Sequence, residues 1–274
     1  INAAEPGSLT VLFDPLVDSS YTDYYKVTLQ DSNFNTLSSF ETGKDGTITA
    51  AVETAGVYWA IVQATDYYHT DNVYGLTASV SSQTGTVETE NNDTFATADD
   101  LTEGTQIQGQ LSSSSDVDWF QYTVTGAASL NLAFDLPSNS SYTDYFSIQI
   151  LEDGDTIYSG VETGKDGSIK ASIDEAGTYY VKITSTDYYH DSGQYGLTLT
   201  EGTYDDNYEQ EHNGYLNTNG SSSGTGTRLT NDQTMSGQLF DRSDTDFYYI
   251  NAAEPGSLTV LFDPLVDSSY TDYY

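Results

Sequence analysis

The chain has no cysteine, and only 7 of its 274 residues are lysine or arginine, against 42 aspartates and glutamates. The absence of cysteine excludes disulfide bonds and thiolate metal sites, so each folded unit must depend on its apolar core or on cations bound through oxygen. The formal net charge of −35 excludes nucleic-acid binding, because backbone phosphates would be repelled rather than neutralised. The scarcity of basic residues also argues against docking on anionic lipid.

Long hydrophobic runs are missing too. No apolar segment approaches the ~20 residues that a membrane-spanning helix needs, so we expect no membrane insertion. The usual nucleophile, zinc-protease and phosphate-loop motifs do not occur, and we expect no enzymatic activity. The 24 tyrosines and 10 phenylalanines nevertheless supply enough apolar surface for the chain to fold despite its charge.

Internal repetition determines how the chain is organised. Residues 1–25 recur without change at 250–274, which sets a period of 249 residues (250 − 1 = 249). Within that period, residues 8–77 align without a gap on residues 129–198, and 31 of the 70 positions are identical. The period therefore holds two diverged copies of one module.

The second copy carries an insertion. The sequence Gly-Gln-Leu at 109–111 recurs at 237–239, and the extra residues of the second copy fall in the Gly/Ser-rich run at 219–226. Such a composition is typical of a flexible insertion rather than of a core element.

Only one module is complete. We place it at residues 83–201, after the C-terminal part of a split module at 1–82 and before the N-terminal part of the next split module at 202–274. Overlapping the duplicated 25 residues joins the two fragments into one whole module. The sequence is then either a segment of one long covalent run of repeats or a subunit whose broken module a neighbour completes. Both interpretations predict a head-to-tail array of the protein with itself.

Short alternating segments separated by turn residues recur along each module, which is typical of a β-sandwich or barrel. In the complete module we predict strands near residues 105–111, 118–125, 129–135, 145–151, 156–161, 168–173, 178–185 and 194–200. No stretch has a sustained helical period. We therefore predict an all-β fold of tandem jelly-roll-like antiparallel β-sandwiches, with about eight strands in each.

Several motifs of the complete module occur in the order of a known family. They are Glu88-Thr-Glu-Asn-Asn-Asp93, Ile107-Gln-Gly-Gln-Leu111, Asp116-Val-Asp118-Trp-Phe, the strand at 129–134, Gly177-Thr-Tyr-Tyr-Val and Tyr195-Gly-Leu. With these motifs the module resembles the bacterial pre-peptidase C-terminal (PPC) domain family and is similar to the collagen-binding domains of clostridial collagenases. The resemblance implies an eight-stranded jelly-roll-like sandwich that serves secreted proteins as a non-catalytic accessory module, and hence an extracellular or cell-surface location.

Acidic and amide side chains cluster at two places in the complete module. Four lie within six residues and two more lie in the turn before the second strand: Glu88, Glu90, Asn92, Asp93, Asp116 and Asp118. A hard cation such as Ca²⁺ takes six to eight oxygen ligands, which such a set can supply. The resemblance implies the same ion, because the collagen-binding relatives hold calcium with a matching segment and turn. We predict a calcium site here; the alternative is a solvated acidic linker.

The split module repeats most of this pattern. The equivalent residues are Glu209, Glu211, Asn213, Asp244 and Asp246. Gly214 replaces the second aspartate of the first segment, so we expect a weaker site or one that uses the nearby Asp205 and Asp206. Asn92 also lies in a glycosylation sequon, and it could not carry a glycan while its amide binds a cation.

Three loops are almost identical in the two modules, and in an antiparallel up-and-down order they gather at one pole. Their aspartates are our candidate binding residues: Asp23, Asp45 and Asp66, with Asp144, Asp166 and Asp187. The interpretations are a junction to the next module, a second cation site, or a sugar-binding platform.

One outward face differs between the modules. Where the complete module has Tyr180 and Lys182, the split module has Trp59 and Ile61. An exposed apolar stripe around Trp59 indicates a partner surface, and the alternative is a surface covered by the module's own loops. Three of the five lysines lie in the complete module, which predicts a mildly basic patch facing an acidic neighbour.

We predict first a structural role, as a segment of an extracellular filament or surface adhesin built from calcium-stabilised sandwiches. The alternative is a module that binds a polysaccharide or a collagen-like polymer, and a third interpretation is an accessory region of a secreted protease. The expected partners are the protein itself and, in the alternative, a glycan; nucleic acid is not expected.

Overall fold

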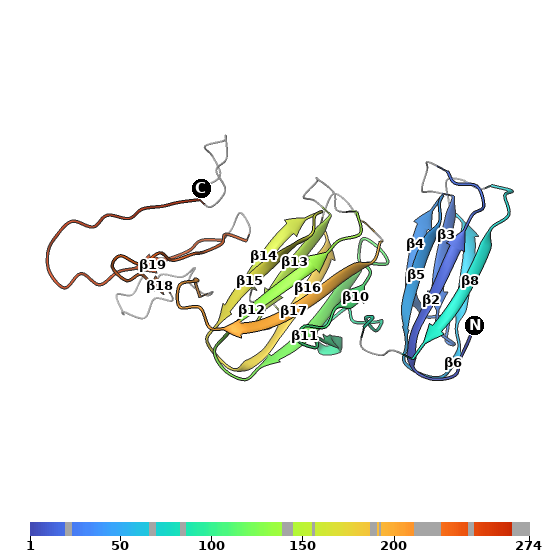
Figure 1. Cartoon of the computed structure of the whole chain (residues 1–274), viewed down its shortest axis with the longest axis horizontal. Helices are drawn as coiled ribbons and strands as arrows, with labels where there is room; N and C mark the ends of the chain where they lie inside the picture. The colour runs from blue at the N-terminus through green and yellow to red at the C-terminus, as the bar shows by residue number, and fades with distance from the viewer. Residues whose placement is uncertain are drawn as a thin grey trace.

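The computed structural model describes residues 1–19, 24–65, 70–82, 86–138, 145–154, 157–186, 191, 193–210, 226–240 and 244–264. Its regular structure is almost entirely β, and the prediction of an all-β fold is confirmed. Three units follow one another along the long axis of the molecule (Figure 1). We call them the N-terminal part (residues 1–82), the middle sandwich (residues 86–203) and the C-terminal part (residues 204–264).

The middle sandwich consists of two sheets. The first has the strand order β10 (Ile107–Gly109), β17 (Tyr195–Thr203), β12 (Ala128–Asp135) and β15 (Gly167–Ile173). The second has the order β14 (Ile157–Thr163), β13 (Phe146–Leu151), β16 (Gly177–Ser185), β11 (Val117–Val124) and β9 (Asp99–Asp100), and the short 3₁₀ helix η1 (Phe95–Thr97) precedes β9. All ladders between these strands are antiparallel except that of β9 with β11.

The core of the middle sandwich lies between the two sheets. Alternate residues of β13 and β16, such as Ile148 and Val181, are at most 2% exposed, as their spacing in the sequence predicts. Removing a leucine, isoleucine or phenylalanine side chain from water contributes about 1.5–3 kcal/mol, so this core can hold a unit without disulfides.

The N-terminal part repeats the end of β11 and the strands β12 to β17 of the middle sandwich, 121 residues earlier. Its sheets have the orders β5-β2-β8, β4-β3-β7 and β1-β6. The strands are β1 (Asn2–Ala3), β2 (Gly7–Asp14), β3 (Tyr25–Gln30), β4 (Thr36–Thr42), β5 (Gly46–Val52), β6 (Gly56–Val57), β7 (Trp59–Ala64) and β8 (Gly75–Ser81). The registers match as well: Leu9 faces Ala50 as Leu130 faces Ala171.

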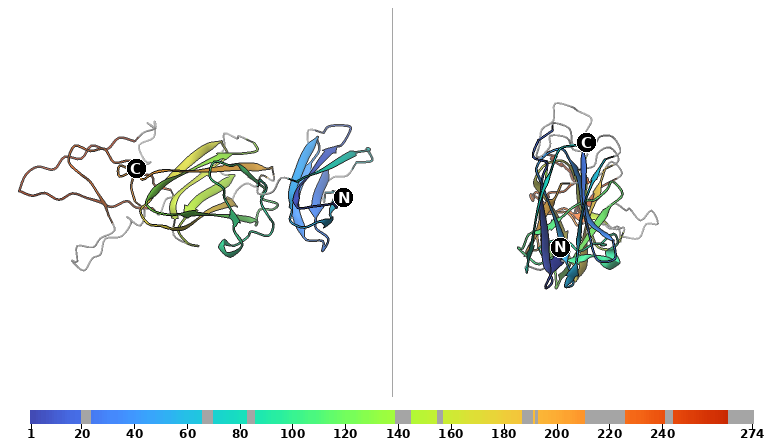
Figure 2. Two further views of the ribbon diagram at one scale, coloured as in Figure 1. Left: turned by 60° about the horizontal axis from the view of Figure 1, so that its bottom comes forward. Right: turned by 90° about the vertical axis from the view of Figure 1, so that its right-hand side faces the viewer.

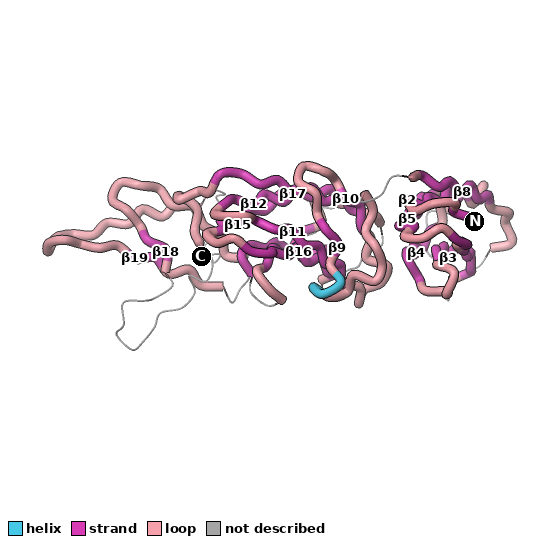
Figure 3. Tube along the Cα trace, turned by 90° about the horizontal axis from the view of Figure 1, so that it is seen from below, coloured by secondary structure: helices cyan, strands magenta, loops and turns pink. Residues whose placement is uncertain are grey.

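The C-terminal part contains the front of a module. Its strands β18 (Thr227–Arg228) and β19 (Tyr248–Tyr249) pair in parallel, in the register that β9 and β11 adopt 128 residues earlier. Figure 3 shows that the rest of this part is mainly loop.

One segment of identical sequence has two different environments. In the N-terminal part, Leu9, Val11 and Phe13 lie in β2 and are 0–1% exposed. Their identical counterparts in the C-terminal part, Leu258, Val260 and Phe262, are 66–72% exposed and belong to no strand. After β19 the chain forms a wide extended loop at the end of the molecule opposite the N-terminal part, and its last described residues turn back toward the rest of the molecule (Figures 1 and 2). Separately, no helix among the described residues is long and apolar enough to cross a membrane.

Candidate cation site

The candidate cation site of the middle sandwich lies where β11 begins. Residues 86–88 run parallel to β10, and the Glu88 N–H donates to the Gln108 carbonyl at 2.9 Å, while the Trp119 N–H of β11 donates to the Asn92 carbonyl at 3.1 Å. Carboxylate oxygens of Glu88, Glu90 and Asp118 all lie within 4.8 Å of one another. This spacing fits one cation bound between the three carboxylates.

Two carboxylates of the site also hold the loop between β10 and β11. Glu88 Oε1 accepts a hydrogen bond from the Gln110 N–H at 2.6 Å. Asp116 Oδ2 accepts one from the Ser112 N–H, also at 2.6 Å. Hydrogen bonds to ionised carboxylates are stronger than neutral ones, so the position of this loop depends on the cluster.

Two buried side-chain oxygens of the predicted residues have no hydrogen-bond partner. Asp118 is 0% exposed; its Oδ2 accepts the Tyr195 hydroxyl at 2.5 Å, while its Oδ1 has no partner. Asn92 is also 0% exposed; its Nδ2 donates to Asp99 Oδ2 at 3.4 Å, while its Oδ1 has no partner. Buried polar atoms almost always have partners, so these two oxygens fit the ligand set of a cation. A glycan on the buried Asn92 does not fit the folded sandwich.

The electrostatics of the cluster also favour a bound cation. Burial, followed by the nearby carboxylates, raises the pKa of Glu88 and of Asp118 well above the usual range. Burial, together with Asp116 and Asp93, raises the pKa of Glu90 to about 8. None of the ion pairs between described residues involves this cluster. A divalent cation would supply the positive charge that allows these carboxylates to ionise together.

The structure places all six predicted residues of the complete module in this cluster and adds two that sequence reasoning missed. Asp93 joins the cluster through a hydrogen bond between its side chain and Asp116. Asp99 was missed although it accepts the Thr89 N–H at 2.6 Å and orients the Asn92 amide. Tyr195 was also missed, although its recurrence in the split module as Tyr74 is a signal that could have found it.

The C-terminal part rebuilds half of this arrangement. The Glu209 carboxylate accepts the Gln238 N–H, and Asp244 Oδ2 accepts the Phe240 N–H at 2.9 Å. Asp246 lies at the position that corresponds to Asp118 in the middle sandwich. The predicted ligands Glu211 and Asn213 lie outside the described residues.

The two alternative ligands of the C-terminal part point elsewhere. Asp205 forms an ion pair with Lys170 at 2.5 Å and accepts the Asn207 N–H at 3.0 Å, and Asp206 is exposed. Lys170 also lies over the Tyr208 ring, 4.9 Å from its centroid. A lysine of the middle sandwich thus contacts an acidic residue of the next unit.

The loops held by the carboxylates contact the preceding unit in both places where units meet. Between the N-terminal part and the middle sandwich, the Ser38 hydroxyl donates to Gln110 Oε1, and the Ser39 hydroxyl donates to the Ser112 carbonyl at 3.2 Å. We call this contact the first joint.

The second joint lies between the middle sandwich and the C-terminal part and uses equivalent residues. The Ser159 hydroxyl donates to Gln238 Oε1 at 2.9 Å, and Gln238 Nε2 donates to the Gly160 carbonyl at 3.0 Å. Ser159 is the repeat equivalent of Ser38, and Gln238 is that of Gln110. The same contact is therefore made twice.

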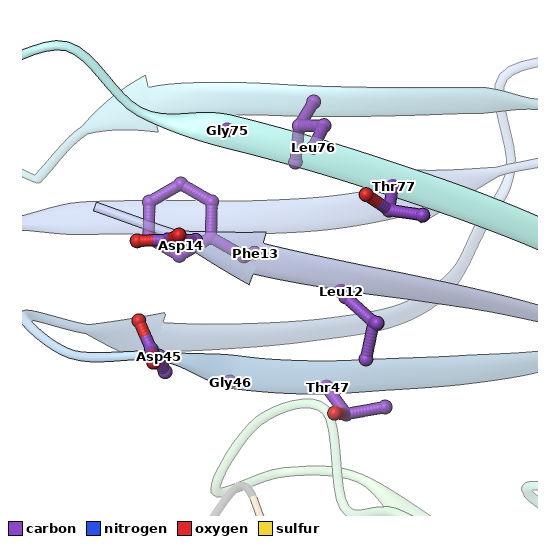
Figure 4. A pocket seen from close by; sticks show the side chains of 9 residues that line it. All are labelled: Leu12, Phe13, Asp14, Asp45, Gly46, Thr47, Gly75, Leu76 and Thr77. Atoms are coloured by element: carbon purple, nitrogen blue, oxygen red, sulfur yellow. The ribbon is translucent and has the colours of Figure 1, made fainter. Parts of the chain in front are cut away.

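The other candidate binding residues are scattered. Four of them lie outside the described residues: Asp23, Asp66, Asp144 and Asp187. Asp166 Oδ1 accepts the Leu136 N–H at 2.8 Å and so fixes the loop that follows β12. Asp45 lines a hollow of about 470 Å³ at the ends of β2, β5 and β8, together with Asp14 (Figure 4). Burial, followed by Asp14 and Asp18, raises the pKa of Asp45.

Trp59 is 45% exposed and stacks on Phe34, which is 63% exposed. Their ring centroids are 5.8 Å apart and the ring planes differ by 23°. The pair forms a small flat aromatic surface on the edge of the N-terminal part.

Comparison with known proteins gives weak structural similarities. No family model and no curated protein matches the chain. A pre-peptidase C-terminal domain of a collagenase from Bacillus anthracis is similar, with 17% identity and a TM-score of 0.31, over 38% of this chain and 94% of that one. Tandem CBM51 modules of a family 98 glycoside hydrolase from Streptococcus pneumoniae have 10% identity and a TM-score of 0.27, over 73% and 78%. The human MASP-1/3 CUB1-EGF-CUB2 region has 15% identity and a TM-score of 0.27, over 73% and 92%.

Proposed function

We propose that the chain is a non-catalytic repeating segment of an extracellular filament or surface adhesin, in which calcium stiffens the joints between sandwiches. One observation carries the proposal: both joints use equivalent residues, and in each joint the contacting loop is held by carboxylates of a candidate cation site. A contact that recurs at equivalent positions gives each unit the same relation to the previous one, as a regular shaft requires.

The cation acts on the joint through the backbone. Glu88 fixes the Gln110 N–H, and the side chain of Gln110 meets Ser38 of the preceding unit. With a cation bound, the carboxylates stay ionised and the loop has one position. Without it, burial and mutual repulsion favour protonation or rearrangement of the cluster, and the loop loses its support.

The surface charge fits a long shaft. A net charge of −35 over 274 residues keeps parallel shafts apart in solution, while the bound cations neutralise the acidic residues gathered at each joint. Because a net charge of this size also repels itself within one chain, we expect the folded chain to need divalent cations or high salt for its stability.

Electron microscopy of native material, with and without EDTA, tests the proposal. We expect straight filaments with a regular axial repeat in calcium, and curved or fragmented ones after chelation. Monodisperse single particles in calcium would refute the structural role. Filaments whose stiffness is the same in EDTA would remove calcium from the joints.

A second candidate function is glycan binding, which the exposed stack of Phe34 and Trp59 favours. Flat exposed aromatic rings are suited to contact the apolar faces of sugars. Titration of the chain with soluble polysaccharides should then show binding that Trp59→Ala abolishes. Val73→Ala, at another exposed apolar residue of the same part, is the matched control and should bind normally.

A further inference from the structure

We propose that a second copy of this sequence completes the split module, and that its Tyr74 enters the acidic cluster formed by Glu209, Asp244 and Asp246. The cation site of the split module would then be built from two copies. The inference rests on the proposed array and specifies which strands and which residues join successive copies.

Two strands of the N-terminal part have an edge that is paired in the middle sandwich. There, β16 pairs with β11 and β17 pairs with β10. Their equivalents β7 and β8 pair only with β3 and β2 among the described residues. The consequence appears at Leu76, which is 42% exposed, whereas its equivalent Leu197 is 0% exposed beside its ladder partner Ile107 of β10. The missing strands correspond to residues 235–237 and 245–249 of the C-terminal part.

A short piece of one missing strand shows the register. In the middle sandwich, Thr123 and Val124 at the end of β11 pair with Thr178 and Gly177. In the N-terminal part, the equivalent β1 pairs Asn2 with Val57 and Ala3 with Gly56, which is the same register. Since residues 1–25 and 250–274 are identical, residues 245–249 extend this strand along β7.

The side chains that would meet along β7 are complementary. In the middle sandwich, Trp119 faces Lys182, whose ammonium lies 5.2 Å from the Trp119 ring centroid. In the split module the equivalent pair is Phe247 and Ile61, so an aromatic–cation pair is replaced by an apolar pair at the same ladder position.

The pair two positions further along the ladder also becomes more apolar in the split module. Gln121 faces Tyr180 in the middle sandwich, and the equivalent pair is Tyr249 and Trp59. Trp59 is 45% exposed in the N-terminal part and Tyr249 is 46% exposed in the C-terminal part, and pairing the two strands would bury both rings.

Tyr74 already stands where the completed site needs it. In the middle sandwich, Tyr195 is 1% exposed, packs on Phe146 at 6.1 Å, and donates to Asp118. Tyr74 packs at 6.0 Å on Tyr25, the equivalent of Phe146, but it is 42% exposed. Its ring therefore has the right position on its own strands, while the acidic cluster it should meet belongs to the C-terminal part.

In the C-terminal part, Tyr248 occupies the position beside Glu209 that Tyr74 would take. The Tyr248 hydroxyl donates to Glu209 Oε2 at 2.7 Å and lies against Gly237. In the middle sandwich, the ring of Tyr195 lies against the equivalent Gly109, while Phe120, the equivalent of Tyr248, is in the core. On completion we expect Tyr248 to turn into the core and Tyr74 to replace it beside Glu209.

Disulfide trapping tests the strand pairing directly, because the chain has no cysteine of its own. The variant with Ile61→Cys and Phe247→Cys should form disulfides between chains and give a ladder on a non-reducing denaturing gel. The control combines Ile61→Cys with Leu261→Cys, which places the second thiol at the most exposed site of the same segment, 92% exposed. No ladder, or an equal ladder in the control, would overturn the completion.

The role of Tyr74 has a separate test. Tyr74→Phe removes only the hydroxyl. We expect it to lower the association constant of the chain in calcium about tenfold, because one hydrogen bond to a charged group is lost. Sedimentation equilibrium measures this constant. Tyr58→Phe is the matched control, because its hydroxyl donates within its own part, to the Thr54 carbonyl at 2.9 Å. An unchanged association constant for Tyr74→Phe would exclude Tyr74 from the shared site.

The outcomes separate this inference from the proposed function. Filaments in native material without the cysteine ladder would overturn the completion and leave the filament role, whereas a ladder without filaments would support the completion and overturn only the filament role. A denaturing gel of native material identifies the source of the second copy: a single very large species means the next repeat of one polypeptide, and a species of single-repeat size means a separate subunit.

Discussion

Replacing Asp118 with asparagine separates the penalty of a buried charge from the benefit of a bound cation. Asp118 is fully buried, accepts the Tyr195 hydroxyl at 2.5 Å, and has one oxygen without a partner. Burial, followed by Asp116, raises its pKa, so its ionised form destabilises the metal-free fold. Asparagine has nearly the same shape without the charge. In EDTA we therefore expect Asp118→Asn to melt at the same temperature as the natural chain or higher.

Calcium should reverse that order. A cation at a hundred times its dissociation constant stabilises the fold by about 2.7 kcal/mol. In a sandwich of this size, 1 kcal/mol corresponds to roughly 4 °C, so the natural chain should gain about 10 °C in melting temperature. Asp118→Asn loses a charged ligand at the centre of the cluster and should gain little.

Differential scanning calorimetry in EDTA and in calcium measures both effects. Asp100→Asn is the matched control, because Asp100 is exposed and accepts Gln121 Nε2 at 2.9 Å, outside the cluster. It should behave like the natural chain in both buffers. If the natural chain melts identically in the two buffers, or if Asp118→Asn gains as much as the natural chain, the cluster is not a cation site.

Three further predictions concern the cluster and the joints. In EDTA, the free energy of unfolding should fall by a few kcal/mol as the pH rises from about 5 to about 8. Glu90 has a pKa of about 8 in the folded chain against an ordinary 4.5, so the folded chain binds more protons than the unfolded chain in this range. Urea titrations should show this fall, and a flat profile would contradict it. Gln110→Ala combined with Gln238→Ala should loosen both joints without lowering the melting temperature, and X-ray scattering should report a shorter average end-to-end length; an unchanged length would mean that the joints do not depend on these side chains. Gly109→Ala should destabilise the middle sandwich by about 1–3 kcal/mol, because the added carbon collides with the tyrosine and glutamate side chains of the cluster, whereas Gly126→Ala has open space and should be neutral in denaturant melts.

The fold of the complete module could be predicted from the sequence because its strands alternate. Residues such as Ile148 and Ile150 occur at every second position, and that period specifies both the strand and its buried face. β9 could not be predicted in this way. It has two residues, Asp99 and Asp100, and its place beside β11 depends on tertiary pairing rather than on a local pattern.

The candidate site was predictable only where its residues are close in sequence. Glu88 and Asp93 stand within six residues and carry a recognisable spacing, and Asp116 and Asp118 form a second local group. Tyr195 reaches the cluster from a strand 77 positions after Asp118, so no local pattern could assign it. The joints were hidden for the same reason, since serine and glutamine occur throughout the chain and only the geometry pairs them.

The duplicated segment shows what the sequence alone cannot decide. Leu9 and Leu258 have identical neighbours in the sequence, yet one is fully buried and the other is 66% exposed. Their alternating pattern is the same, so the difference comes from the strands available on each side: β5 and β8 flank the first copy, and neither has a counterpart in the C-terminal part as described. A strand of this kind is stable only when partners cover its apolar face, because an isolated strand cannot bury enough surface to offset the loss of chain entropy. The exposed copy therefore has the sequence of a core strand but lacks, among the described residues of its own part, flanking strands equivalent to β5 and β8.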